Sequence, residues 1–273
     1  MNDLHLISLG AGVQSSTMAL MAAKGEITPM PAAAIFADTG AEPESVYRWL
    51  DWLEKELPFP VYRVMNHDGL VSDIFRVRRK RDGTGTWSPS GIPHYSTNPD
   101  GTSGQAPRQC THDFKLLPIR RQVRRLLKET ASAHAKLLIG ISLDEIYRMK
   151  DSTVQYLSNL YPLIDRRLRR GECLAWMRKH SFPTPPRSAC VFCPYRSNTD
   201  WRVLKTSEPA EFAKAVQFER DYEAVKRSTT GGKNIRLFLH PSRVPLAEVD
   251  LSTDIDHGQG LLFNNECEGM CGV

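Results

Sequence analysis

Cysteines are the residues of this sequence with the clearest capacity for chemistry. Cys190 and Cys193 form a CxxC pair in "CVFC". This spacing places two thiolates on one metal ion or cluster, and it is also the spacing of a redox-active dithiol. Cys110 and Cys173 complete a candidate set of four ligands. Four thiolates suit either a [4Fe-4S] cluster or a structural zinc ion, and the spacing does not separate these two from each other. The alternative is a group of unrelated buried cysteines.

A second cysteine pair lies near the C-terminus. Cys267 and Cys271 form a CxxxC pattern with two glycines in "FNNECEGMCGV". Such a segment is unsuited to a protein core. Its likeness to the short cysteine tail of sulfonucleotide reductases makes both cysteines candidate catalytic residues. One of them could carry a persulfide, or the two could form a disulfide during turnover. The alternative is a spare metal-binding tail.

The first forty residues contain a glycine- and serine-rich turn, "GAGVQSS", between a predicted strand and a predicted helix. Gly10 and Gly12 allow a sharp turn and a close approach to a ligand. Ser15 and Ser16 stand at the start of the helix, where hydroxyls and the helix dipole favour an anion. The pattern predicts a phosphate site without a charged side chain. The sequences GxxxxGK[ST] and GxGxxG are both absent, which disfavours P-loop kinases and Rossmann dehydrogenases. A simple tight turn is the alternative.

A second polar turn follows the next predicted strand. Asp38 and Thr39 come directly after the apolar run "AAAIFA", and a helix begins a few residues later. Side chains at the carboxyl end of a buried parallel strand are placed where ligands bind. Because Asp and Thr also form caps and turns, a purely structural role is the alternative.

The predicted elements alternate between strand and helix over the first 150 residues. This pattern is typical of an α/β fold with a parallel sheet and helices on both faces. We expect one domain at 1–160 and a smaller, mostly helical, cysteine-containing region at 161–273. Residues 83–104 are rich in Gly, Ser, Thr and Pro, which predicts a long loop. The expected strands are 4–7, 32–38, 61–65 and 135–142, and the expected helices are 17–23, 43–57 and 116–130.

Composition limits the class of protein. The chain has 273 residues, of which 41% are hydrophobic and 25% are charged, as in a soluble globular protein. It has no apolar run of 18 residues and no export signal, so we expect a cytoplasmic protein without a membrane span. Six cysteines in such a chain argue against a disulfide framework.

The net charge of +5 is concentrated in three short basic blocks. Such blocks are commonly solvated faces. Three of them in one small protein favour a phosphate-rich partner, including tRNA or DNA. The blocks are 76–81, 120–128 and 166–170.

Taken together, these motifs resemble the phosphoadenylyl-sulfate reductase branch of the PP-loop ATP pyrophosphatases, whose fold is adenine nucleotide alpha hydrolase-like. The likeness covers roughly residues 4–205, and the matching segments follow in the family's order. The family's usual loop is Ser-Gly-Gly-x-Asp-Ser, so this chain lacks the first Ser and the Asp. The segments are "GAGVQSS", "DTGAEPES", "RQCTHDFKLLPIRR", "GISLDEIYR", "YPLID" and "CVFCPYRSNTDW".

The resemblance implies roles for individual residues. The loop residues would cradle nucleotide phosphates, and Asp38 and Thr39 would lie beside the adenosine or the activated phosphate. Arg148 would neutralise a leaving pyrophosphate. Asp144 or Glu145 would hold Mg²⁺, although acidic residues are also common at helix starts. The implied nucleotide-binding residues are Gly10, Gly12, Ser15, Ser16, Asp38, Thr39, Gly140, Asp144 and Glu145.

The resemblance also favours the cluster over zinc. A cluster-bearing member of the branch uses adjacent cysteines at the first position. Here Gln109 replaces one of them, so that Cys173 would supply the missing ligand.

Three functions follow as expectations. The first is an ATP-dependent sulfur-transfer enzyme that adenylates a substrate, a nucleic acid such as tRNA or DNA, for thiolation with an iron–sulfur cluster and a sulfur donor. The second is a reductase of phosphoadenylyl sulfate, with Cys267 or Cys271 as nucleophile and a thioredoxin-like reductant. The third is a non-catalytic module that binds nucleotides or nucleic acid.

Overall fold

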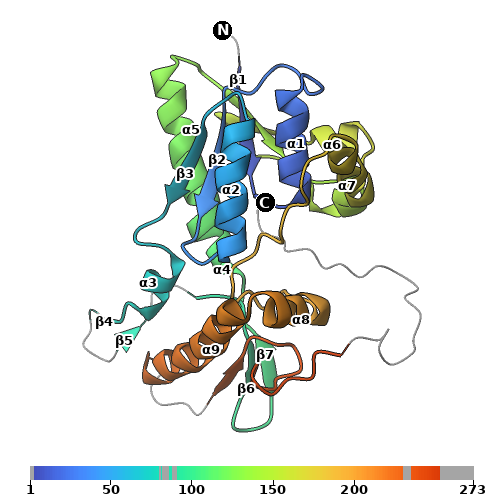
Figure 1. The fold of residues 1–273 in the computed structure, drawn as a ribbon. Coiled ribbons are helices and arrows are strands. Elements are labelled where there is room, and N and C mark those ends of the chain that lie inside the picture. Colours follow the sequence, from blue (N-terminus) through green and yellow to red (C-terminus); the bar gives the residue numbers. More distant parts are fainter. Residues whose placement is uncertain (1–2, 80, 82–85, 88–90, 230–234, 253–273) are drawn as a thin grey trace. The chain divides into compact units, whose positions relative to one another are not determined.

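The computed structural model describes residues 3–79, 81, 86–87, 91–229 and 235–252 (Figure 1). The contacts divide these residues into two units. The first unit comprises 3–66 and 113–188, and the second comprises the described parts of 67–112 and 189–252. The chain therefore does not divide at residue 160 as expected, because each unit is built from two separate segments. Cys267 and Cys271 lie outside the described residues.

The first unit contains a parallel sheet of five strands in the order β3-β2-β1-β8-β9. Strand β1 is central, and its Ile7 is in register with Ala34 of β2 and Leu138 of β8. Strands that are covered on both faces are mostly apolar in sequence, which explains the run AAIFA in β2 and the run LLI in β8. The strands are β1 (Leu4–Leu9), β2 (Ala33–Asp38), β3 (Val61–Met65), β8 (Ala135–Ile139) and β9 (Leu157–Leu160).

Helices cover both faces of this sheet, which confirms the predicted fold class. On one face, Ile7 and Phe36 pack in a core with side chains of α1 (Val13–Ala23), α2 (Glu44–Glu56) and α7 (Arg170–Lys179). On the other face, Leu6 and Ile35 pack against α5 (Leu117–Glu129). Neighbouring residues of one strand thus supply the two cores in turn. The short helix α6 (Pro162–Asp165) contributes Leu163 to the first core.

The second unit combines helices with small antiparallel sheets. Strands β6 (Tyr95–Thr97) and β7 (Ser103–Gln105) form a hairpin, and β10 (Arg236–Phe238) pairs with β6. The predicted loop at 83–104 therefore contains strands, as does the region expected to be mostly helical. The hairpin turn is stabilised by Asp100, whose carboxylate accepts the N–H of Thr102 at 2.9 Å. The remaining elements are α3 (Leu70–Phe75), β4 (Arg78–Arg79), β5 (Thr86–Trp87), α4 (Gln109–Thr111), α8 (Asn198–Ser207) and α9 (Pro209–Thr229).

Within the described part of the chain, no helix is both long and apolar enough to cross a membrane.

Candidate functional site

The predicted phosphate loop joins β1 to α1, at the carboxyl end of the central strand. Its left-handed residue is Ala11, with φ of 57°, whereas Gly12 is extended with φ of −93°. A Cβ atom added at Gly12 would meet only Ser188 Cβ, at 3.9 Å, which is an ordinary contact. The turn itself therefore does not require a glycine at position 12, contrary to the conformational part of the prediction. Close approach of a phosphate remains the predicted reason for this glycine.

The two serines of the loop occupy different environments. The Ser15 hydroxyl donates to the Gly12 carbonyl at 3.3 Å, within the loop. Ser16 has no exposed surface, and its hydroxyl accepts a hydrogen bond from the Trp49 indole at 3.0 Å. Ser16 thus anchors α1 to α2. The predicted binding of an anion by this loop would rest on the backbone N–H groups in the first turn of α1, together with the dipole of this helix.

Gly140 brings the end of β8 against this loop. A Cβ atom at position 140 would lie 2.6 Å from Ser15 Cα and 2.7 Å from Ser15 N, both backbone atoms. Only glycine allows so close an approach. The structure therefore brings together two of the predicted segments, the loop after β1 and the glycine after β8.

Gln14 connects the loop to the acidic segment that follows β8. Its side-chain N–H groups donate to Glu145 Oε2 at 3.2 Å and to Ser142 Oγ at 3.4 Å. Glu145 also forms an ion pair with Arg148. From the sequence, position 14 was noted only because it has Gln where the family has Asp. An aspartate here would set a carboxylate against Glu145, whereas the glutamine amide donates a hydrogen bond to it.

The neighbouring carboxylate, Asp144, has a different contact. Both of its oxygens accept the backbone N–H of Arg170 at 3.3 Å, at the start of α7. Asp144 thus contacts the N-terminus of α7, a helix other than the one that it was predicted to begin. Because Glu145 is paired with Arg148, either carboxylate would have to exchange a partner to bind Mg²⁺. The metal role of both residues stays a prediction, as does the pyrophosphate role of Arg148.

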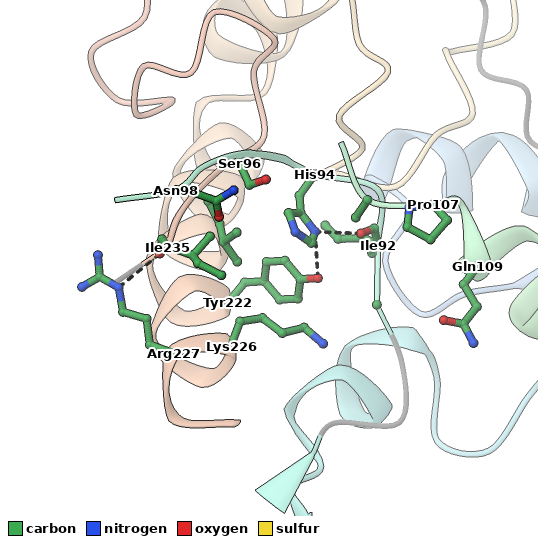
Figure 2. A pocket seen from close by; sticks show the side chains of 13 residues that line it. Ile92, His94, Ser96, Asn98, Pro107, Gln109, Tyr222, Lys226, Arg227 and Ile235 are labelled. Atoms are coloured by element: carbon green, nitrogen blue, oxygen red, sulfur yellow. Dashed lines mark hydrogen bonds between the residues drawn. The ribbon is translucent and has the colours of Figure 1, made fainter. Parts of the chain in front are cut away.

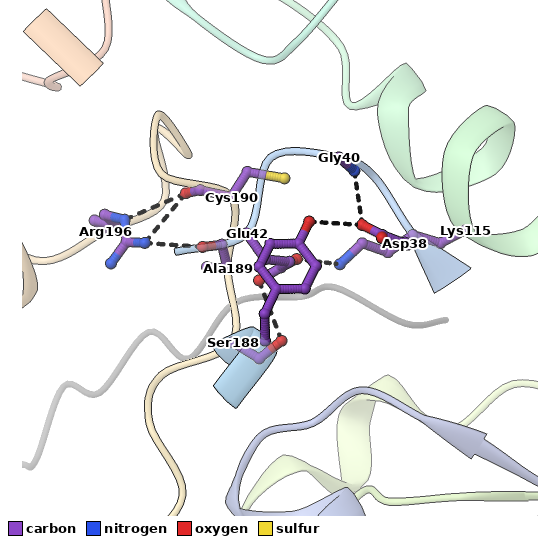
Figure 3. Close-up of polar contacts among 9 residues, drawn as sticks. Asp38, Gly40, Glu42, Lys115, Ser188, Ala189, Cys190 and Arg196 are labelled. Carbon is purple, nitrogen blue, oxygen red and sulfur yellow. Dashed lines mark hydrogen bonds and ion pairs between the residues drawn. The ribbon is translucent and has the colours of Figure 1, made fainter. Parts of the chain in front are cut away.

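Asp38 is held in place at the end of β2 (Figure 3). Its Oδ1 atom accepts hydrogen bonds from the Gly40 N–H and the Tyr47 hydroxyl, each at 2.8 Å. Burial, followed by the hydrogen bond to Asp38, raises the pKa of Tyr47 above its usual value, so the phenol remains a donor. The adjacent Thr39 is buried. The predicted position of Asp38 at the ligand-binding edge of the sheet is therefore a rigid one.

A buried ion pair that sequence reasoning did not assign lies in the same unit. Lys115 Nζ is 3.7 Å from Glu42 Oε1, and the Glu42 side chain is only 1% exposed. The Ser188 hydroxyl donates to Glu42 Oε2 at 3.4 Å (Figure 3). Ser188 is also the neighbour of Gly12. Both residues lie in motifs quoted above, Glu42 in "AEPES" and Lys115 in "DFKLL". Nothing in the sequence indicates that the two side chains are in contact.

The CxxC pair belongs to the second unit. The Cys193 N–H donates to the Cys190 carbonyl at 2.9 Å, which closes a tight turn. The buried Arg196 guanidinium donates to the carbonyls of Ala189 at 2.8 Å and Cys190 at 3.2 Å (Figure 3). Arg196 therefore fixes the backbone that carries the cysteines. Sequence reasoning did not single out this arginine, although it lies in the motif "CVFCPYR".

The other two predicted ligands differ from each other. Cys110 lies in α4 of the second unit and is partly exposed. Cys173 lies in α7 of the first unit, has no exposed surface and packs in the apolar core with Leu163 and Met177. Burial raises the pKa of the Cys173 thiol to about 12. The metal role of Cys173 therefore stays a prediction, for a thiol that lies in the first unit.

Among the described residues, no three His, Cys, Asp or Glu side chains are grouped in a way that would hold a metal ion.

Comparison with known proteins gave matches among solved structures alone. No model of a protein family matches the sequence, and no curated protein matches it. The chain is similar to a phosphoadenylyl-sulfate (PAPS) reductase from Candida auris in a phosphate complex, with 12% identity and a TM-score of 0.41, over 68% of this chain and 76% of the reductase. It is also similar to the U34-tRNA thiolase NcsA from Methanococcus maripaludis with its [4Fe-4S] cluster, with 15% identity and a TM-score of 0.38, over 82% of this chain and 73% of the thiolase.

Proposed function

We propose that this protein is an ATP-dependent sulfur-transfer enzyme of the PP-loop type, which adenylates an oxygen of a nucleic acid so that sulfur can replace it. The observation that carries this proposal is the contact between Gly140 and the backbone of Ser15. It supports a built nucleotide site, because it joins the phosphate loop to the end of β8 at the carboxyl edge of a parallel sheet, where such folds bind ligands. Asp38 and the Glu42–Lys115 pair belong to the same unit.

The proposed first step transfers AMP to the substrate. The substrate oxygen attacks the α-phosphorus of ATP, a new P–O bond forms, and the bond to the β-phosphate breaks, so that pyrophosphate leaves with the electron pair. The first turn of α1 would bind the phosphates through its N–H groups. Lys115 would supply the positive charge that the loop sequence lacks. Mg²⁺ bound with ATP would neutralise further phosphate charge.

The proposed second step replaces oxygen by sulfur. A sulfide ion attacks the activated carbon, a C–S bond forms, and AMP leaves with the former substrate oxygen and the electron pair of the broken C–O bond. A [4Fe-4S] cluster, when bound, would hold and activate the sulfur. Thiolates are the ligands that such a group takes, and the candidates are Cys110, Cys190 and Cys193, which all belong to the second unit. Among the described residues these three thiols are not grouped to hold a metal ion, so they would have to rearrange to bind the cluster. Zinc is the alternative occupant for the same thiolates.

The cysteines give a prediction with a matched control. Anaerobically purified protein should be brown and contain about four irons per chain, as a cubane cluster requires. Cys190→Ser or Cys193→Ser should remove the colour, because each variant deletes a thiolate ligand. Cys173→Ala should retain it, because the buried Cys173 belongs to the other unit. Iron assay and visible absorbance measure both results. Stoichiometric zinc without iron in anaerobic preparations would contradict the proposed cluster. Loss of iron in Cys173→Ala would show that Cys173 is a ligand, as in the predicted set of four cysteines.

The basic blocks support a nucleic acid as the substrate. Arg124 and Arg125 are exposed on α5, and Arg166 and Arg167 are exposed after α6. Part of the block at 76–81 lies outside the described residues. Arginines of this kind bind phosphates and release condensed counterions, so binding of tRNA or DNA should weaken as the salt concentration rises.

The sequence of the C-terminal tail favours a second candidate function, the reduction of phosphoadenylyl sulfate. Cys267 or Cys271 would attack the sulfur atom and form an enzyme thiosulfonate, and the nucleotide would leave from sulfur. A thioredoxin-like dithiol would then release sulfite and become a disulfide. The nucleotide would occupy the same loop in both candidate functions.

A panel of nucleotides separates these functions. The adenylating enzyme should release pyrophosphate from ATP when nucleic acid is present, and it should form no sulfite. The reductase should instead form sulfite from phosphoadenylyl sulfate and depend on the tail. Binding of ATP or nucleic acid without either product would support the non-catalytic module and contradict the proposed function.

A further inference from the structure

The second unit contains a pocket whose lining includes none of the residues of the predicted nucleotide site. Its volume is about 310 Å³, and it lies between β6, the start of β10 and the last turns of α9 (Figure 2). This size lies within the range of pockets that bind small molecules, and a bare phosphate or sulfide ion would leave most of it unfilled. The polar residues that line it include His94, Ser96, Asn98, Gln109, Tyr222 and Lys226.

The pocket offers donors and acceptors at fixed positions. His94 Nδ1 lies 3.0 Å from the Ile92 carbonyl, which can only accept, so this nitrogen carries the proton. Burial lowers the pKa of His94, which keeps the ring neutral and leaves Nε2 as an acceptor. Tyr222 Oη is 3.1 Å from the same Nδ1 atom. The amide of Asn98 and the hydroxyl of Ser96 add groups that can both donate and accept.

Two cations, Lys226 and Arg227, also line the pocket, and Arg227 forms an ion pair with Glu223. Lys226 lies one helical turn after Tyr222 on α9, and its Nζ is 5.4 Å from the centre of the Tyr222 ring. Burial lowers the pKa of Lys226, since a half-buried ammonium loses part of its hydration. A ligand with an anionic group beside this lysine would offset that loss. The lining therefore suits a ligand with a polar ring edge and a nearby negative charge.

The pocket is connected to the cysteines by direct packing within the second unit. Phe192, which lies inside the CxxC turn, stacks on Phe218 with ring centres 3.6 Å apart. Phe218 in turn stacks on Tyr222 at 5.6 Å. On the other side, Gln109 lines the pocket and is followed directly by Cys110. Stacked aromatic rings thus connect the CxxC turn to the pocket, of which Tyr222 is a lining residue.

We propose that this pocket receives the target base of the nucleic-acid substrate, in an unstacked state, with the adjoining phosphate beside Lys226. This inference rests on the proposed function and deepens it. A nucleotide has the required combination of a flat ring, an edge with donors and acceptors, and a negative charge. The proximity of the pocket to Cys110 and the CxxC turn would bring the base to the sulfur chemistry.

Gly91 provides a variant that fills the pocket. A Cβ atom at this position would lie 3.6 Å from Tyr222 Oη and 3.9 Å from Lys226 Nζ, so alanine fits in ordinary contact. The longer side chain of Gly91→Leu would occupy the space of the ligand. Gly171→Leu is the matched control, because nothing lies within 4 Å of a Cβ atom at that position in the first unit.

The experiment measures binding of short single-stranded RNA and DNA oligonucleotides to the full chain by fluorescence anisotropy, at about 50 mM salt, where basic surfaces bind most readily. Gly91→Leu and Lys226→Met should weaken binding by roughly tenfold or more, the range of a lost base or phosphate contact. Gly171→Leu should bind like the wild type, and all variants should bind ATP normally. Gly91→Ala, which needs no rearrangement, should show a smaller loss in the same direction. RNA and DNA probes distinguish the two sources of the base.

A crosslink locates the base directly. Oligonucleotides that contain 4-thiouracil or 5-iodouracil should crosslink under light to the tryptic peptide 221–226, which includes Tyr222. Wild-type binding that all pocket variants retain, with crosslinks only elsewhere, would overturn the pocket and leave the proposed function intact. A wild-type protein that binds ATP but no oligonucleotide would overturn the nucleic-acid function and the pocket together.

Discussion

Replacing Gly140 by alanine should abolish tight ATP binding, although the change adds a single methyl group. The new Cβ atom would lie 2.6 Å from Ser15 Cα and 2.7 Å from Ser15 N, so the phosphate loop or the end of β8 must move. Overpacking of this kind costs about 1–3 kcal/mol of folding free energy. Because the moved backbone is the proposed phosphate cradle, ATP affinity should fall by at least about tenfold. Calorimetric titration measures the affinity, and urea unfolding measures the stability.

Gly12→Ala is the matched control for this experiment. The added Cβ atom would meet Ser188 Cβ at 3.9 Å, and the backbone at Gly12 is extended, so the fold should keep its stability. Any loss of ATP binding in Gly12→Ala would then report on the space that a phosphate needs. Wild-type ATP affinity in Gly140→Ala would show that the nucleotide binds away from this loop.

The second large loss, of both stability and ATP affinity, should follow when Lys115 is removed from its buried ion pair with Glu42. Lys115→Met leaves a carboxylate that is 1% exposed without its 3.7 Å partner. Loss of one partner of a buried pair costs about 3–5 kcal/mol, and the 12% exposure of Lys115 places the expected loss near the lower value. ATP binding should weaken as well, since the proposed phosphate counter-charge is gone. Glu42→Gln keeps that charge and should retain ATP affinity.

The double variant Glu42→Gln/Lys115→Met tests whether the two charges act as a pair. Its unfolding free energy should exceed that of Lys115→Met, because no buried charge is then left behind. Stability losses that simply add between the two single variants would show that the pair is not coupled. Equal ATP affinity in wild type and Lys115→Met would remove this lysine from the proposed site.

The sequence indicated the main sheet of the first unit well, for a physical reason. Strands β1, β2 and β8 are short, mostly apolar segments between turn residues, and such segments are typical of parallel strands covered on both faces. Strand β3 was also predicted, although it is an edge strand with an exposed Arg63. The edge strand β9 was missed because "LSNL" is half polar and little longer than a turn. The strands at Tyr95–Thr97 and Ser103–Gln105 were also missed, because their residues resemble a loop and pairing with the distant β10 defines them.

The candidate site was predicted where a single residue determines the geometry. Gly140 is such a residue, since its lack of a Cβ atom is the feature that the contact requires. Pairs that are distant in the chain were missed, as with Gln14 and Glu145 or Glu42 and Lys115. Cys173 was included to replace the family cysteine that Gln109 lacks, and its burial in an apolar core is not indicated by the cysteine spacing. Residue type indicates which chemistry is available, while the fold decides which groups meet.

The central claim is that AMP is transferred to a nucleic acid, and a label on the α-phosphate of ATP tests it most directly. Wild-type protein, Mg²⁺, labelled ATP and the substrate RNA or DNA should be combined without any sulfur donor, so that the adenylated substrate accumulates. The proposed function predicts that the label becomes attached to the nucleic acid while pyrophosphate is released, and that Gly140→Ala abolishes both. Label that leaves as ADP, or pyrophosphate release with no label on any nucleic acid, would contradict it.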